Sequence, residues 1–303
     1  MHRDRVTSEG KKQGRIRLAL QLCFAALLNG YAVGFSKGKI FTGGIKGVCV
    51  PVLNCYSCPG ALGACPIGSI QALLGGTKTK IPFYVLGMLT LFGVVFGRLL
   101  CGFVCPFGLV QDLFAKIPVK KLKVPKKADK FLRLIKYGVL AVFVILLPLL
   151  LKNEFGVGDP FFCKYICPAG TLGGGIPLVL TNESLRALAG KLFGWKTLVL
   201  VLILAGSIWI PRLFCRYLCP LGAFYALFNR FSLYRMTVDK EKCVHCGKCE
   251  KACPMAVDVP ENICSGECIR CGKCKSVCPT NAISSGPDVG QSKKKSEQGD
   301  RSR

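Results

Sequence analysis

Four apolar stretches alternate with polar segments along this chain. They cover residues 16–33, 81–100, 131–151 and 195–214. A helix needs about 20 mostly apolar residues to cross a membrane, and each stretch is close to that length. Hydrophobic residues make up 51% of the whole chain. The pattern predicts an α-helical membrane protein with four transmembrane helices.

The basic residues are unevenly distributed along the chain, which has a formal net charge of +26. Residues 1–17 carry six lysines and arginines, 97–130 carry eight and the part after 210 carries sixteen, whereas 34–80 and 152–194 carry only five and four. Positive charge collects on the cytoplasmic loops of membrane proteins. The distribution therefore predicts four spans with both termini in the cytoplasm, and no nucleic-acid partner is expected.

Two cysteine-containing segments recur where apolar stretches end. RLLCGFVCPFG at 98–108 returns as RLFCRYLCPLG at 212–222. The preceding loops, NCYSCPGALGACPIG (54–68) and FCKYICPAGTLGG (162–174), also align if Cys58–Pro59 is matched with Cys167–Pro168. Such repetition indicates an internal duplication. We expect two halves related by an axis along the membrane normal, each with two spans, an outer cysteine loop and an inner CxxxCP motif.

The most specific motifs lie near the C-terminus. CVHCGKCEKACP (243–254) and CIRCGKCKSVCP (268–279) have the C-x2-C-x2-C-x3-C-P spacing of two-cluster bacterial ferredoxins, in which the fourth cysteine of each run binds the other run's cluster. One 4Fe-4S cluster is predicted on Cys243, Cys246, Cys249 and Cys278. The second is predicted on Cys268, Cys271, Cys274 and Cys253. A zinc ribbon also uses paired cysteines, but two complete runs favour a small α+β ferredoxin-like domain.

Four further cysteines lie on the predicted inner face: Cys101, Cys105, Cys215 and Cys219. Four thiolates are the ligand set of one 4Fe-4S cluster. In a continuous helix, positions four apart share a face, so both cysteines of a pair can point at one site before the proline bends the backbone away. The alternative is that these cysteines pack as small hydrophobic side chains.

The outer loops hold five candidates for another cluster: Cys55, Cys58, Cys65, Cys163 and Cys167. Disulfide bonds are the alternative, because the extracytoplasmic side permits them. The spacing does not decide which four of the five bind, and it assigns no role to Cys49 or to Cys264. Arg98 and Arg212, which precede the inner cysteines, are expected to extend their charged groups to the membrane interface. The other interpretation is that they donate hydrogen bonds to cluster sulfurs.

Other redox and catalytic chemistry is poorly represented in the sequence. His2 and His245 are its only histidines, so a membrane haem held by two histidines is excluded, and there is no CxxCH motif for covalent haem. No Rossmann or Walker loop, serine triad or carboxylate pair is present. We therefore expect no catalytic residue beyond iron–sulfur ligands.

These patterns predict six consecutive regions. They are a basic cytoplasmic N-terminus (1–15), a first membrane half (16–115), a basic cytoplasmic linker (116–130), a second membrane half (131–235), a two-cluster ferredoxin domain (236–284) and a disordered tail (285–303).

With four spans, CGFVCP after the second, CRYLCP after the fourth and a two-cluster ferredoxin domain, the chain resembles membrane polyferredoxins of the NapH-type quinol dehydrogenase family. The resemblance implies a multi-pass protein of the prokaryotic cytoplasmic membrane that holds two to four 4Fe-4S clusters. It implies an electron-transfer component, such as an oxidoreductase subunit of quinol dehydrogenase type. Electrons are expected to pass between the cytoplasmic clusters and either quinone or an extracytoplasmic redox partner. An assembly or maturation factor that reduces metal ions or thiols for a respiratory enzyme is the alternative.

Overall fold

The chain divides into two units, which are described separately. The computed structural model describes residues 2–78, 80–122 and 124–287. The first unit comprises residues 2–19, 90–103 and 225–287, and the second comprises 20–89 and 104–224. Most of the predicted disordered tail, 285–303, lies outside the described residues.

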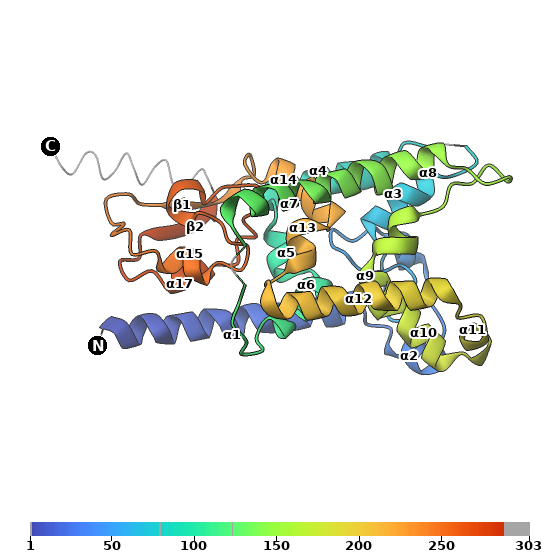
Figure 1. Ribbon diagram of the computed structural model, residues 1–303, viewed down its shortest axis with the longest axis horizontal. Helices are drawn as coiled ribbons and strands as arrows, with labels where there is room; N and C mark the ends of the chain where they lie inside the picture. Colours follow the sequence, from blue (N-terminus) through green and yellow to red (C-terminus); the bar gives the residue numbers. More distant parts are fainter. Residues whose placement is uncertain (1, 79, 123, 288–303) are drawn as a thin grey trace. The chain divides into compact units, whose positions relative to one another are not determined.

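A two-stranded antiparallel sheet joins the two ends of the cysteine-rich segment in the first unit. β1 (Tyr234–Val238) pairs with β2 (Ile283–Pro287), with Met236 opposite Ser285 (Figure 1). Between the strands the chain forms three short helices: α15 (Lys248–Ala252), α16 (Val259–Asn262) and α17 (Lys273–Ser276). Met236 and Ile283 from the strands pack with Val259 of α16 and the neighbouring Ile263 in a small core. The segment is a small α+β domain, as its sequence predicts.

The same backbone geometry occurs twice in this domain, 25 residues apart. Three pairs of residues at this spacing have positive φ angles: His245 (48°) and Arg270 (52°), Gly247 (67°) and Gly272 (74°), and Ala256 (45°) and Asn281 (51°). Non-glycine residues adopt this conformation rarely, so its repetition at matched positions is a structural requirement. Such left-handed residues help to turn successive backbone N–H groups toward one point, a concavity found at many Fe–S sites. The two cysteine runs therefore fold as two copies of one substructure.

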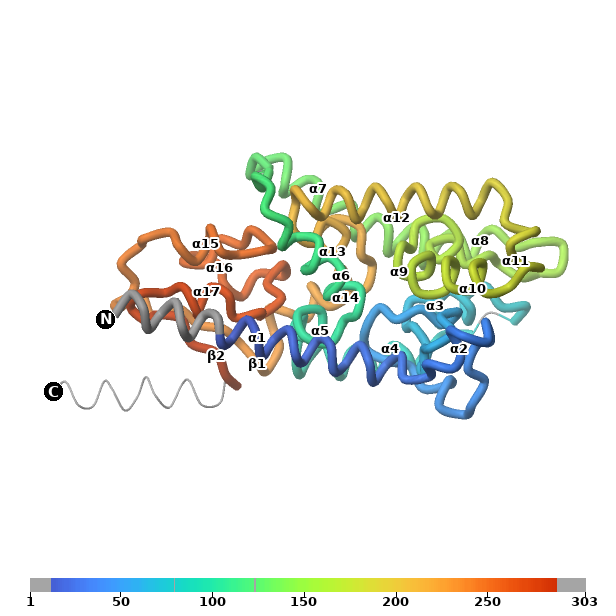
Figure 2. The backbone as a smooth tube through the Cα atoms, turned by 90° about the horizontal axis from the view of Figure 1, so that it is seen from below, coloured from blue at the N-terminus to red at the C-terminus, as the bar shows by residue number. Residues whose placement is uncertain are grey.

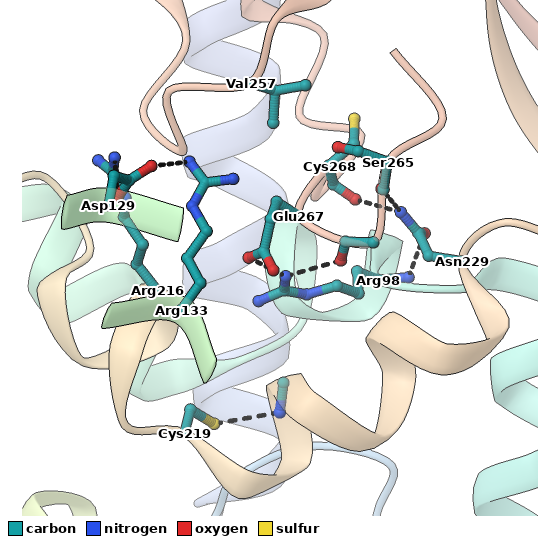
Figure 3. A network of polar contacts seen from close by, with 12 residues as sticks. Arg98, Asp129, Arg133, Arg216, Cys219, Asn229, Val257, Ser265, Glu267 and Cys268 are labelled. Atoms are coloured by element: carbon teal, nitrogen blue, oxygen red, sulfur yellow. Dashed lines mark hydrogen bonds and ion pairs between the residues drawn. The ribbon is translucent and has the colours of Figure 1, made fainter. Parts of the chain in front are cut away.

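A buried ion pair holds the loop at 265–270 in the first unit. This unit also contains α5 (Leu99–Phe103) and parts of α1 (His2–Leu28), α4 (Phe83–Phe96) and α14 (Pro220–Phe228). Arg98, which is 0% exposed, donates through Nη1 to Oε2 of Glu267 at 2.9 Å and to the Gly266 carbonyl at 2.8 Å. The side chain of Asn229 accepts from the Arg98 backbone N–H and donates to the carbonyls of Ser265 and Cys268 (Figure 3).

We expect Glu267→Gln to destabilise this unit strongly, because the buried Arg98 guanidinium loses its carboxylate. Removing one partner of a buried ion pair costs about 3–5 kcal/mol. The measurement is thermal unfolding of the purified full chain. Asp239→Asn is the control: it neutralises the exposed pair with Lys242, and the melting temperature should not change. An equal effect of both substitutions would contradict this account of the loop.

Two long apolar segments dominate the second unit. The first is a continuous helical stretch of α7 (Lys126–Gly138), the π-helical η2 (Val139–Leu146) and α8 (Leu147–Leu150). The second is α12 (Lys191–Trp209), and Figure 2 traces both. The remaining helices of this unit are short: α2 (Ala32–Lys37), η1 (Gly44–Gly47), α3 (Pro66–Leu74), α6 (Pro106–Phe114), η3 (Phe162–Ile166), α9 (Pro168–Gly170), η4 (Thr171–Gly175), α10 (Ile176–Thr181), α11 (Glu183–Ala187) and α13 (Leu213–Tyr217).

Two of the four predicted spans coincide with helices of sufficient length. Within the described ranges, only Lys126–Leu150 and Lys191–Trp209 are both long and apolar enough to cross a membrane. α4 has 14 residues and stops at Phe96, because Gly97 takes a left-handed φ of 56°. α1 reaches only Leu28, so about half of it precedes the apolar stretch. The spans at 16–33 and 81–100 therefore remain predictions.

Candidate metal centres

Two cavities in the C-terminal domain are lined by the cysteines that the sequence assigns to two clusters. The first cavity is lined by Cys243, Cys246, Cys249 and Cys278, among mainly apolar neighbours. The second is lined by Cys253, Cys268, Cys271 and Cys274. In both cavities the fourth cysteine comes from the opposite run. Val259 lies in the wall of both cavities.

The chemistry of these cavities fits an iron–sulfur cluster. Burial, and after it the neighbouring Cys271 and Cys253, raise the pKa of Cys268 to about 12. Burial and the neighbouring Cys271, Cys268 and Cys253 likewise raise the pKa of Cys274. Crowded thiolates without a cation are unfavourable, whereas a bound metal cluster compensates their charge. The left-handed residues beside each run supply the backbone concavity that such a group requires.

A second group of cysteines converges in two loops of the second unit, which the sequence predicts to lie on the outer side. It consists of Cys55, Cys65, Cys163 and Cys167. A side-chain carbon built on Gly170 would lie 3.5 Å from Sγ of Cys55 and 3.8 Å from Sγ of Cys167. At Gly68 it would lie 3.9 Å from Cβ of Cys65 and 4.0 Å from Sγ of Cys163. The two glycines therefore lie beside all four cysteines, and a side-chain carbon at either position would be in van der Waals contact with two of them.

Electrostatics identifies the same four thiols. After burial, which is the largest cause, Cys163, Cys55 and Cys65 each raise the pKa of Cys167. Burial and then Cys55 raise the pKa of Cys163 to about 11, and Cys163 and Cys55 both raise that of Cys65. Each thiol of the set thus interacts with the other three.

Cys58 is placed differently from those four. Its thiol interacts with Cys55 and donates to Oδ1 of Asn29 at 3.5 Å. Lys46, which is buried, donates to the Ala61 carbonyl at 2.7 Å and lies near both Cys55 and Cys58. All twenty cysteines fall within the described residues, and none forms a disulfide bond there. The five candidates therefore reduce to one group of four and one cysteine beside it.

A cysteine–proline step begins a helix at four places. Pro66, Pro106, Pro168 and Pro220 are the first residues of α3, α6, α9 and α14, and each follows a cysteine. Proline suits this position because its missing N–H is not needed there and its φ is already helical. At Cys219 the Gly222 N–H donates back to Sγ at 3.3 Å. Cys58–Pro59 begins no helix, so the structural counterpart of Cys167 in the first outer loop is Cys65.

The inner motifs differ from the predicted continuous helix. α5, which carries Cys101, ends at Phe103, and Cys105 has an extended backbone (φ −70°, ψ 116°) before α6. The proline thus starts a second helix instead of bending the first away. Cys105, Cys215 and Cys219 belong to the second unit and are buried, and Cys101 belongs to the first.

Carboxylates anchor the second inner motif to its surroundings. Arg212 makes a bidentate pair with Asp112, Nε to Oδ1 at 2.9 Å and Nη2 to Oδ2 at 2.6 Å. Asp129 of α7 accepts from the Tyr217 hydroxyl at 2.7 Å and pairs with Arg216 and with Arg133 (Figure 3). These contacts fix both sides of Cys215.

The expected interfacial position of Arg98 and Arg212 is wrong. Both side chains are 0% exposed and are paired with Glu267 and Asp112 respectively. A guanidinium that extends to the interface keeps its head in water, and these two do not. Their carboxylate partners lie far away in sequence, so a reading of the local motif could not reveal them.

A glutamine side chain donates to a cysteine sulfur at both the outer and the inner cysteines, a contact that the cysteine motifs do not predict. Gln71 donates through Nε2 to Sγ of Cys163 at 3.3 Å, and its Oε1 accepts from the Phe162 backbone N–H at 3.0 Å. Gln111 donates to Sγ of Cys215 at 3.0 Å and accepts from the Phe214 N–H at 3.1 Å. The sequence signal is CPIGSIQ (65–71) repeated as CPFGLVQ (105–111).

The repeated glutamine contact pairs different segments of the chain from those that the sequence alignment pairs. In the structure, 65–71 corresponds to 105–111, and FCKYICPAG (162–170) corresponds to FCRYLCPLG (214–222). An outer segment is therefore equivalent to an inner one at both places.

No single metal ion has a ready site. Across the described ranges, no three histidine, cysteine, aspartate or glutamate side chains converge closely enough to hold one ion.

Comparison with known families assigns iron–sulfur binding to both units. A family model described as a 4Fe-4S binding domain matches residues 63–84, 81–125, 137–177 and 192–237. Each of these four matches contains one cysteine–proline step that begins a helix. Two further models with the same description match residues 235–258 and 265–284. Together these matches cover more than half of the chain.

The curated relatives of the chain include a ferredoxin-type protein. The chain is 28% identical over 197 residues to the uncharacterized protein MJ0749 of Methanocaldococcus jannaschii, covering 65% of this chain and 68% of that one. It is 32% identical to MJ0750 of the same organism, over 56% of this chain and 64% of the relative, which is less than two thirds of that protein. It is 29% identical over 243 residues to the ferredoxin-type protein NapH of Haemophilus influenzae, covering 79% of this chain and 74% of NapH. No solved structure matches the chain.

The recurrent cysteine–proline steps, the two cysteine-lined cavities of the C-terminal domain and these matches agree with one another. The chain belongs to the NapH-type polyferredoxins, a family of 4Fe-4S binding proteins.

Proposed function

We propose that this polyferredoxin conducts electrons across the prokaryotic cytoplasmic membrane, between its cytoplasmic ferredoxin domain and either quinone or a redox partner on the outer side. The observation that carries the proposal is that the outer cysteine group and Cys215 lie at opposite ends of one apolar helix, α12. The relatives' names support the electron-transfer part, since NapH is called ferredoxin-type and YccM of Escherichia coli a putative electron transport protein.

The first turns of α12 adjoin the outer group. Trp195 donates through Nε1 to the Tyr165 carbonyl at 3.1 Å, and Lys196 interacts with both Cys55 and Cys163. At the other end, Cys215 follows Trp209 by six residues. The 19 residues of α12 rise about 28 Å, close to the hydrocarbon thickness of about 30 Å. The helix is therefore long enough to hold one cysteine group near each face of a bilayer.

Four ligand sets serve this function. Two are the cavity cysteines of the ferredoxin domain. The outer set is Cys55, Cys65, Cys163 and Cys167, with Cys58 excluded by its contact with Asn29. The inner set is Cys101, Cys105, Cys215 and Cys219, taken from the repeated CxxxCP motif. Bound there, 4Fe-4S clusters would supply one-electron carriage, while the protein supplies the thiolate ligands and hydrogen-bond donors.

The orientation in the membrane follows from charge. The basic segment 116–130 and the ferredoxin domain lie on the cytoplasmic side, and the outer cysteines lie in the loops with few basic residues. With 16–33 and 81–100 as the two further spans, the chain crosses the membrane four times. Cytoplasmic donors then meet the ferredoxin domain, and outer partners meet the loops at 49–65 and 162–175.

Vesicles containing a trapped oxidant test the proposal. The purified full chain is reconstituted in quinone-free vesicles loaded with ferricyanide, and dithionite is added outside. We expect bleaching of the trapped ferricyanide well above that of protein-free vesicles, and acceleration by added menaquinone if quinone is the natural acceptor. Iron and acid-labile sulfide should reach about 16 atoms each per chain, because each of four clusters contributes four. Bleaching at the protein-free rate both with and without menaquinone, or about eight irons per chain, would overturn the proposal.

A further inference from the structure

Gln71 and Gln111 make the same set of contacts at two places far apart in the sequence. Each is 0% exposed. Besides the cysteine sulfur, each Nε2 reaches the carbonyl four residues earlier, Ile67 at 3.2 Å and Phe107 at 3.5 Å. Each glutamine therefore contacts a cysteine sulfur, a phenylalanine backbone N–H and the carbonyl four residues earlier. A glutamine that only filled space would not need the same three contacts at both places, so the two glutamines form one arrangement that occurs twice.

The orientation of each amide is fixed by the backbone. Oε1 faces the N–H of Phe162 or of Phe214. That N–H can only donate, so the oxygen must lie there and the NH₂ group must face the sulfur. The contact at the sulfur is therefore an N–H donor directed at a cysteine, at 3.3 Å for Cys163 and 3.0 Å for Cys215.

A donor in this position affects the two redox states of a cluster unequally. Hydrogen bonds to cluster sulfurs are one of the factors that set the reduction potential of an iron–sulfur centre. The reduced cluster carries more negative charge, and a hydrogen bond to a more negative acceptor is stronger. A buried N–H donor at a ligand sulfur thus favours reduction.

We propose that Gln71 and Gln111 are matched positioning residues that raise the reduction potentials of the outer and the inner cluster respectively. Each glutamine lies on the helix that follows a cysteine–proline step, and its side chain binds both a cysteine sulfur and the backbone N–H of the residue before that cysteine. It therefore also connects its cluster to that helix. The inference rests on the proposed function, because it assumes that Cys163 and Cys215 bind clusters.

The two residues serve as controls for one another. In the full chain, Gln71→Met should lower the midpoint potential of the outer cluster and leave the inner one unchanged, and Gln111→Met should do the reverse. At a fixed solution potential, the ratio of reduced to oxidised cluster should fall about tenfold. For one electron this corresponds to a fall of about 59 mV in the midpoint potential. Redox titration followed by EPR gives the potentials, and the iron content shows that the clusters are retained.

Two further variants separate tuning from simple support. Gln71→Glu keeps an oxygen for the Phe162 N–H but removes the amide donor, so the outer potential should fall as in Gln71→Met. Gln21→Met removes a buried glutamine of the same unit whose Nε2 donates to Oδ2 of Asp112 at 3.2 Å, and the outer potential should stay at its wild-type value. The inference alone is overturned if Gln71→Glu keeps its full iron content and its outer potential is unchanged. It is also overturned if Gln21→Met shifts the outer potential as much as Gln71→Glu does. A wild-type chain with about eight irons overturns the proposed function instead.

Discussion

Cys55→Ser should remove about four iron atoms from each chain, whereas Cys58→Ser should remove none. The two cysteines lie three residues apart in one loop, but only Cys55 interacts with all of Cys65, Cys163 and Cys167. Cys58 donates instead to Asn29. A cluster that loses one of its four protein ligands is not expected to survive purification, so the outer signal should disappear from the EPR spectrum of anaerobically prepared Cys55→Ser protein.

Cys58→Ser is a close control because Cys58 lies in the same loop, is buried, and its hydroxyl replacement can still donate to Asn29. A Cys163→Ser, Cys167→Ser double variant should lose no more iron than Cys55→Ser, since all three substitutions affect the same cluster. Loss of iron in Cys58→Ser, or full iron in Cys55→Ser, would show that a different set of thiols binds.

Double substitutions in the ferredoxin domain should reveal which cysteines share a cluster. Cys243→Ser with Cys278→Ser affects only the first cavity, so we expect a loss of about four iron atoms. Cys274→Ser with Cys278→Ser affects both cavities, so we expect a loss of about eight. Iron and acid-labile sulfide analysis of the purified full chain measures both.

If each run bound its own cluster, the two results would be exchanged, because Cys274 and Cys278 would then be ligands of the same one. Cys264→Ser is the control within this domain. The Cys264 thiol donates to the Met236 carbonyl at 3.1 Å and lines neither cavity, so its replacement should leave the iron content unchanged.

The ferredoxin domain was the part most accessible from sequence. Its ligands follow a fixed spacing, and each cavity is lined by one predicted set of four. The spacing constrains the backbone locally, as the positive φ angles repeated at an interval of 25 residues demonstrate. Local constraint of this kind is visible in a single sequence.

The outer group could not be resolved in the same way, because its members come from two loops about 100 residues apart. The sequence alignment favoured Cys58–Pro59 as the counterpart of Cys167–Pro168, whereas Cys65–Pro66 is the step that begins a helix. The segment FCKYICPAG is more similar to FCRYLCPLG than to NCYSCPGALGACPIG, the segment with which the alignment pairs it. The predicted topology argued against this pairing, because it assigns FCKYICPAG to an outer loop and FCRYLCPLG to an inner motif.

Residues that act through tertiary contacts were missed for a similar reason. Glutamine is seldom a ligand, so Gln71 and Gln111 carried no signal until the structure placed them against sulfurs. The carboxylate partners of Arg98 and Arg212 are 169 and 100 residues away. The left-handed turn at Gly97 that ends α4 also depends on its surroundings, and hydropathy alone did not predict it.

The division of the outer group between two loops has a consequence for biogenesis. Cys55 and Cys65 are synthesised long before Cys163 and Cys167, and Gln71 finds its backbone partner at Phe162 only when that segment has emerged. During translation the first half of the chain therefore exposes thiols without their counterparts. If these four cysteines bind one cluster, as we propose, that cluster can be completed only after Cys163 and Cys167 have been synthesised, and until then the early thiols depend on a reducing or protected environment to escape oxidation.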